Sequence, residues 1–224
     1  MQCKYFRLFI FLLMTLFNVD VAAKSDSVVN LVRYTTEFKI FRDGFYLNFD
    51  QVRTNKPIPK SRILTSIDYK SKTFFDQVTE SQTFTYFDDF GNSQDVETNK
   101  LWGYSKNGIL YINIGGSFNR ITIMGNICHF VANVTTYSNR YNSPYGSPYG
   151  YGSPNHRTTE LKQFLLDFNS GKVLEYDNKN VEMLLMTDPE IHDEFSRLRA
   201  KKKQQLRFMY IRKFNERNPL YIPK

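Results

Sequence analysis

The sequence is poor in the residues that build disulfide-bonded or metal-binding sites. Its 224 residues include 2 cysteines and 3 histidines. Cys3 lies in the apolar segment at the start of the chain, and Cys128 is the one cysteine after it. A mature chain that begins after this segment can form no intrachain disulfide, so its stability has to come from packing.

Cys128 and the histidines form no metal-ligand pattern. Cys128 lies in the apolar run 127–131 without a basic neighbour, so we expect a small buried side chain and not a reactive thiol. His129 is adjacent to Cys128, and neighbouring residues of a strand point to opposite faces. His156 and His192 stand at no ligand spacing from another histidine or cysteine. The sequence therefore predicts no metal site and no cofactor.

Motifs typical of catalysis are also missing. Gly115-Gly116 does not open a helix, as a phosphate-binding loop would, and Ser117 lacks the glycines of a nucleophile elbow. Asp88-Asp89 could act as a pair of acids, but the following Phe90-Gly91-Asn92 favours their use in a turn. The sequence therefore favours a protein that is not an enzyme.

The first 23 residues have the three-part layout of a secretory signal. Lys4 and Arg7 precede an apolar run over residues 8–17, and small residues follow at 21–23. This order predicts a signal peptide that is cleaved after Ala23.

The segment is a poor membrane anchor. A transmembrane helix needs about 20 apolar residues, whereas Asn18 and Asp20 interrupt this run. Lys24 and Ser25 stand where a lipoprotein would carry its lipid-bearing cysteine. We therefore expect an exported protein, periplasmic or secreted, with no lipid anchor, no transmembrane segment after cleavage, and one β-rich domain over residues 24–224.

The charge balance points to an anionic partner. The chain has 30 Lys and Arg against 22 Asp and Glu, a net charge of +8, which falls to +7 without the signal. An envelope protein, a glycan or an anionic membrane surface would suit this charge, and for an exported chain we expect no nucleic acid.

The predicted fold class is α+β, with an antiparallel, meander-like sheet that is curled or barrel-like and packed with C-terminal helices. Alternating apolar residues and Gly or Asn turns indicate the strands. We expect a first hairpin over 38–47, strands at 73–78 and 83–87, and hairpins over 101–114, 118–134 and 161–176. Residues 49–53 predict one helical turn. The C-terminal helical segment, 179–215, predicts a short helix and then one long helix that starts at Pro189 behind the N-cap Asp188.

Two surface segments are candidates for contact with a partner. Residues 141–155 form a low-complexity loop with a Ser-Pro-Tyr-Gly repeat, and its tyrosines could form an adaptable contact surface. The final helix carries a basic run that could contact an anionic surface, or could simply be a solvated face. The candidate residues are Tyr141, Tyr145, Tyr149 and Tyr151 in the loop, and Lys201, Lys202, Lys203 and Arg207 in the helix.

Several segments resemble a known family. They include residues 43–47 (DGFYL), 101–104 (LWGY), 167–173 (DFNSGKV) and 210–219 (YIRKFNERNP). In these the chain is similar to small exported proteins of unknown function from Bacteroidetes-type bacteria. The resemblance implies an envelope or secreted location and a β-rich body with a C-terminal helix, and it supplies no site residues.

Two functions follow from the sequence. The first is a non-catalytic cell-envelope protein, either structural or binding. The alternative is a hydrolase that acts on envelope polymers through a dispersed acidic site. A deep cleft with converging carboxylates would favour the enzyme, and shallow grooves over a filled core would favour binding.

Overall fold

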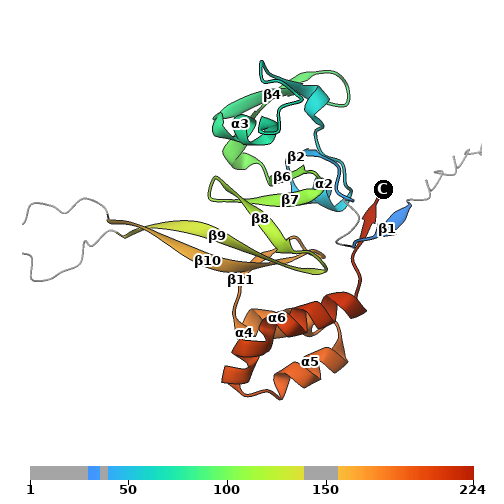
Figure 1. Cartoon of the computed structure of the whole chain (residues 1–224), viewed down its shortest axis with the longest axis vertical. Helices are drawn as coiled ribbons and strands as arrows, with labels where there is room; N and C mark the ends of the chain where they lie inside the picture. The colour runs from blue at the N-terminus through green and yellow to red at the C-terminus, as the bar shows by residue number, and fades with distance from the viewer. Residues whose placement is uncertain (1–29, 36–39, 139–155) are drawn as a thin grey trace, which may run out of the picture.

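The computed structural model describes residues 30–35, 40–138 and 156–224. Its centre is a seven-stranded antiparallel sheet in the order β11-β10-β9-β8-β7-β6-β2 (Figure 1). The strands are β2 (Gly44–Tyr46), β6 (Gly103–Lys106), β7 (Ile109–Ile114), β8 (Ser117–Ile123), β9 (Ile127–Ser138), β10 (His156–Asp167) and β11 (Val173–Glu175). The α+β class and the meander are confirmed. The expected curled or barrel-like closure is wrong, because β2 and β11 lie at opposite edges and do not pair with each other.

Smaller elements surround this sheet. A three-stranded sheet and a two-stranded sheet lie beside it, and three helices follow β11 at one end of the molecule (Figure 1). The remaining strands are β1 (Leu31–Arg33), β3 (Ile63–Leu64), β4 (Thr83–Phe87), β5 (Ser93–Glu97) and β12 (Tyr221–Pro223). The helices are α2 (Phe49–Arg53), η1 (Lys60–Arg62), α3 (Phe74–Glu80), η2 (Thr98–Lys100), α4 (Asn178–Leu185), α5 (Pro189–Ser196) and α6 (Ala200–Arg217).

Apolar clusters cover parts of both faces of the central sheet, and the outer halves of β9 and β10 extend beyond them (Figure 1). Tyr46, Ile112 and Phe130 on one face join a core that α2 and β12 complete. On the other face, Phe45 packs with α3 and the small sheet, whereas Leu165 packs with α4, α5 and α6. Strand residues alternate between faces, so one sheet supports three apolar clusters.

The glycine-containing turns fix the meander as predicted. Asn107 and Gly108 have φ values of 54° and 71°, and they join β6 to β7 in a tight hairpin. β8 pairs with β9, and β10 pairs with β11. Ser138 pairs with His156, so the strands on either side of residues 139–155 form one hairpin.

Two predicted β segments are wrong. Residues 74–80, which overlap the expected strand 73–78, form α3, because Phe74, Phe75 and Val78 reach one core only at helical spacing. The expected hairpin 38–47 is replaced by pairing of β2 with β6 on one side and with Ile58 on the other. Residues 40–43 form no strand, and residues 38 and 39 lie outside the described ranges.

The prediction of one long helix from Pro189 is also wrong. The chain reverses between α5 and α6, and the Phe195 and Tyr210 ring centroids lie 5.1 Å apart. In one continuous helix these residues would be roughly 22 Å apart along the axis. The turn therefore lets both helices bury their apolar stripes in one core. The predicted turn at 49–53, the short helix around Val181 and the Asp188 N-cap are confirmed.

In the described ranges, no helix has the length and apolar character needed to cross a bilayer.

Candidate functional site

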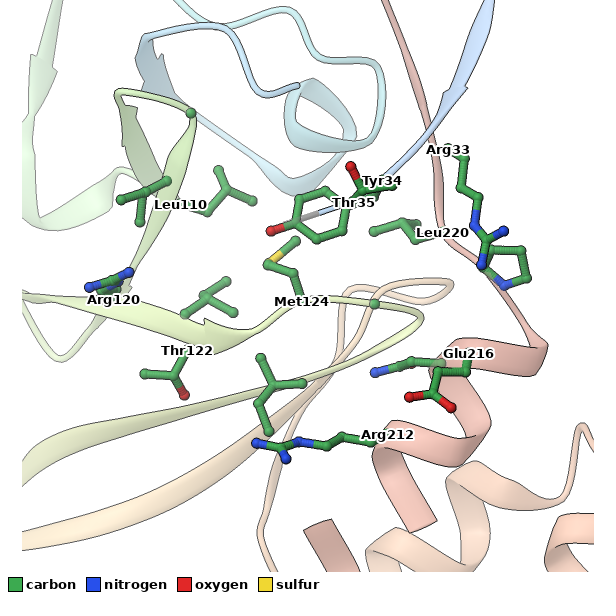
Figure 2. Close-up of a pocket in the computed structure, with 17 residues that line it drawn as sticks. Arg33, Tyr34, Thr35, Leu110, Arg120, Thr122, Met124, Arg212, Glu216 and Leu220 are labelled. Atoms are coloured by element: carbon green, nitrogen blue, oxygen red, sulfur yellow. The ribbon is translucent and has the colours of Figure 1, made fainter. Parts of the chain in front are cut away.

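A groove of about 710 Å³ lies where β1, β8 and the C-terminal half of α6 meet (Figure 2). Arg33 comes from β1, Arg120 from β8 and Arg212 from α6. Tyr34 and Met124 lie between them, and Figure 2 shows the Tyr34 hydroxyl directed into the hollow. Three separate parts of the chain thus supply one cationic site.

Pairing of the first and last described strands positions the β1 side of the groove. Arg33 pairs with Tyr221 across the β1–β12 ladder, and the Tyr34 amide donates to the Leu220 carbonyl at 2.7 Å. Ile222 of β12 is fully buried in the central core. Arg33 is therefore held through β12, which anchors the strand pair to the sheet.

A side-chain amide positions the α6 side. Asn215 Oδ1 accepts from the Ile127 amide at 3.0 Å, and Asn215 Nδ2 donates to the Ile127 carbonyl at 2.8 Å. This pair of bonds reproduces a strand-to-strand contact and ties α6 to β9. These bonds set the position of the α6 backbone at Arg212, three residues earlier on the helix, which lines the groove with β8 residues.

The three arginines of the groove have no acidic partner in the described part of the chain. No ion pair there involves Arg33, Arg120 or Arg212, although Arg53, Arg62 and Arg217 all pair with carboxylates. Guanidinium groups stay protonated, so they leave a positive field around the hollow.

Tyr34 adds a neutral donor to this field. Burial raises the pKa of its hydroxyl above the usual value near 10, while the nearby Arg120 charge opposes the shift. The hydroxyl therefore stays protonated and can donate to a bound oxygen atom.

The predicted basic residues of α6 lie outside this groove. Lys203 Nζ pairs with Glu182 at 2.6 Å, and Arg207 donates to the Tyr176 carbonyl at 2.6 Å while it covers the Tyr176 ring at 4.1 Å. Lys201 and Lys202 are exposed. Contact of these four residues with an anionic surface stays a prediction. The predicted contact loop with Tyr141, Tyr145, Tyr149 and Tyr151 lies outside the described residues.

The Asp88-Asp89 pair belongs to a turn. Asp88 Oδ1 accepts from the amides of Phe90 and Asn92 at 2.9 and 2.8 Å, and hydrogen bonding from Asn92 lowers the pKa of the Asp88 carboxyl. Asp89 forms an ion pair with Arg62. Across the described ranges, no three His, Cys, Asp or Glu side chains gather as metal ligands would.

Cys128 is a buried side chain, as the sequence predicts. It is 0% exposed, and its Sγ donates to the Gly125 carbonyl at 3.2 Å. Burial raises the pKa of the thiol to about 12.

We expect Cys128 to be unreactive toward a thiol reagent in the folded protein at pH 8, because access and thiolate formation are both suppressed. Ellman's reagent should report less than a tenth of one thiol per mature chain within minutes, and one full equivalent in guanidinium chloride. Rapid labelling of the native protein would contradict this burial.

His129 lies against α6 with its ring among aromatic neighbours. The centroid of its ring lies 4.7 Å from that of Phe208 and 5.0 Å from that of Tyr176. Its Nε2 lies 3.1 Å from Gln163 Oε1. The residue is only 4% exposed, and burial lowers the pKa of the imidazole.

This environment predicts a stability that falls in mild acid. In the unfolded chain His129 takes up a proton near pH 6.5, whereas the folded chain resists it down to its lower pKa. The free energy of unfolding should therefore decrease as the pH falls from 7.5 through the folded pKa. Urea unfolding of the wild type and of His129→Gln at pH 7.5 and at pH 5 measures this effect. The difference in free energy of unfolding between the two proteins should be smaller at pH 5, and an equal difference at both pH values would refute this role.

The groove was missed from the sequence. Arg212 is part of the basic run on the last helix, but nothing in the local pattern distinguishes Arg33 or Arg120 from other surface arginines. What distinguishes Arg33 and Arg120 is that they have no carboxylate partner among the described residues, and this can be seen only in the folded chain.

These features define an α+β protein with an open seven-stranded antiparallel sheet at its centre, C-terminal helices and an arginine-lined groove. The chain belongs to a family of unknown function, DUF6563, whose model matches residues 44–218. No curated protein and no solved structure matches the chain. The matched residues include Arg120 and Arg212, and Arg33 lies outside them.

Proposed function

We propose that this chain is an exported, non-catalytic binding protein that holds an anionic ligand in the groove. The observation that carries the proposal is the set of three arginines, Arg33, Arg120 and Arg212, around one hollow without a carboxylate partner among the described residues. A guanidinium group presents a planar fork of donors to a carboxylate, sulfate or phosphate. The groove volume lies within the range of small-molecule sites, about 300–1,000 Å³.

The chemistry of the groove supports binding over hydrolysis. Glu216 is the one carboxylate among the described residues that line it, whereas glycosidases ordinarily use two. Asp88 and Asp89, which the sequence offers as a pair of acids, are engaged in a turn and an ion pair. His129 and Cys128 are buried, so neither is offered to a substrate.

A charge-matched pair of variants tests the proposal. Arg120→Ala/Arg212→Ala removes two groove charges, and Lys70→Ala/Lys72→Ala removes two exposed charges that do not line the groove. With a carboxylated and a sulfated oligosaccharide as probes, we expect calorimetry to show about a 100-fold weaker affinity for the arginine variant, since a bond to a charged group contributes about 1.5–3 kcal/mol. The lysine variant should bind within about threefold of the wild type. An equal loss of affinity in the two variants would contradict the proposal.

The export component has its own test. The protein from the native host should begin at Lys24 and fractionate outside the cytosol. A chain that begins at Met1 in the cytosol would contradict export and leave the groove prediction intact.

A further inference from the structure

We infer that the ligand is an acidic glycan chain with several negative charges that crosses the groove, and not a single small anion. This inference rests on the proposed function, because it takes the arginine-lined groove as the binding site. It assigns Arg33 to one end of the bound chain, and Arg120 and Arg212 to the other.

The arginines do not converge on one point. Figure 2 shows Arg33 on the β1 side of the hollow, and Arg120 on the far side along β8. Arg212 reaches from α6 below β8 (Figure 2). One small anion contacts an arginine fork only at hydrogen-bond distance, so it cannot reach guanidinium groups on opposite sides of the hollow at once. Full use of these three side chains therefore needs anionic groups at separate points along one ligand.

Apolar side chains lie among polar ones on the surface between the arginines. Tyr34 and Met124 are half-buried there, and the buried Leu220 lies beside Tyr34 on the Arg33 side (Figure 2). Such a surface suits the C–H faces of sugar rings. An acidic glycan repeats a charged group on each ring or disaccharide and places an apolar ring face between the charges. This alternation of charges and apolar ring faces suits a groove with apolar side chains between its arginines.

Other polyanions fit less well. Single-stranded nucleic acid is bound on aromatic platforms that stack successive bases, whereas Tyr34 is the one aromatic side chain among the described lining residues. An anionic bilayer is contacted by a protruding basic and apolar face, whereas these arginines surround a concavity. The observations therefore favour a glycan.

The test is a length series with the mature protein. The probes are galacturonate oligomers of one to six sugars, sulfated heparin oligosaccharides of matched length, and neutral maltohexaose as the control. We expect affinity to rise at least tenfold from the monomer to the tetramer and then to level off, with no binding of maltohexaose. The two acidic series show whether the chain carries carboxylate or sulfate groups.

The salt dependence reports how many arginines the chain contacts. Because each ion pair with an acidic chain releases counterions, each of Arg33→Ala, Arg120→Ala and Arg212→Ala should make the slope of log K against log salt shallower for the tetramer. The single variant Lys70→Ala, which removes an exposed charge away from the groove, should leave the slope unchanged. Unchanged thermal unfolding midpoints show that the variants are folded, and the length series needs no variant at all.

The outcomes separate the two proposals. If galacturonate monomer binds as tightly as the hexamer and still requires Arg120, the glycan-chain inference is overturned and the proposed function stands. If no anion binds at any length, both are overturned. Tighter binding of oligothymidylate or of phosphatidylglycerol vesicles than of either glycan series would also overturn the inference.

Discussion

Asn55→Ala should lower the free energy of unfolding by about 3 kcal/mol, a large effect for one polar side chain. Asn55 is 2% exposed and joins three distant segments. Its Oδ1 accepts from the Arg42 amide at 2.9 Å, and its Nδ2 donates to the Ile40 and Pro223 carbonyls at 3.0 and 2.8 Å. Alanine would leave these backbone groups without their partner and would strain the positive φ of 52°.

Asn48→Ala is the matched control for this variant. Asn48 caps the neighbouring helix, α2, through one bond to the Gln51 amide at 3.0 Å, and it is exposed. Its replacement should cost about 1 kcal/mol. Asn55→Asp keeps an acceptor but loses both donated bonds, so it should cost nearly as much as alanine. Guanidinium unfolding measures all three, and the account is wrong if Asn55→Ala costs no more than Asn48→Ala.

Asn55 also shows where sequence reasoning ends. Local patterns identify turns, caps and most strands, because the residues that cause them are adjacent, as in the Asn107-Gly108 hairpin and the Asp188 cap. The residue that ties the C-terminal strand to the N-terminal half makes its contact to Pro223 across most of the chain. A contact between residues so far apart produces no local pattern in the sequence.

The incorrect predictions have the same origin. The composition of residues 73–78 predicts a strand because aromatic and β-branched residues favour strands, yet burial of this segment against Phe45 and Phe84 requires helical spacing. The break between α5 and α6 is set by a shared core with β9 and β10 and not by a proline or glycine at the turn. Tertiary packing overrides local propensity in both.

The candidate site was less predictable than the fold. Net charge pointed to an anionic partner, and the basic run located part of that charge on α6. However, Lys203 and Arg207 of that run are engaged within the protein, whereas the groove takes Arg212 from the next turns of the helix. Charge counts along a sequence cannot separate cations that hold the fold from cations left for a ligand.

Gly125→Ala should destabilise the protein by about 3 kcal/mol through a single contact. Gly125 is buried before β9, and a Cβ there would lie 2.2 Å from Asn215 Cγ and 2.4 Å from its Nδ2. The amide would have to leave Ile127, and α6 would lose its tie to β9. Because Arg212 is held by this tie, affinity for an acidic tetramer should fall as well. Unfolding and calorimetry on the same variant measure both effects.

A double-mutant cycle isolates the cause. Asn215→Ala alone should cost about 2 kcal/mol, because it removes both bonds to Ile127 but creates no clash. The three atoms nearest to a methyl group at position 125 all belong to Asn215, so the double variant Gly125→Ala/Asn215→Ala should be about as stable as Asn215→Ala. Additive losses would instead mean that Gly125 is needed for its own backbone. Non-additive losses would show that Gly125 and Asn215, which are far apart in sequence, form one coupled contact. This contact holds α6, which supplies Arg212, against the sheet that supplies Arg120.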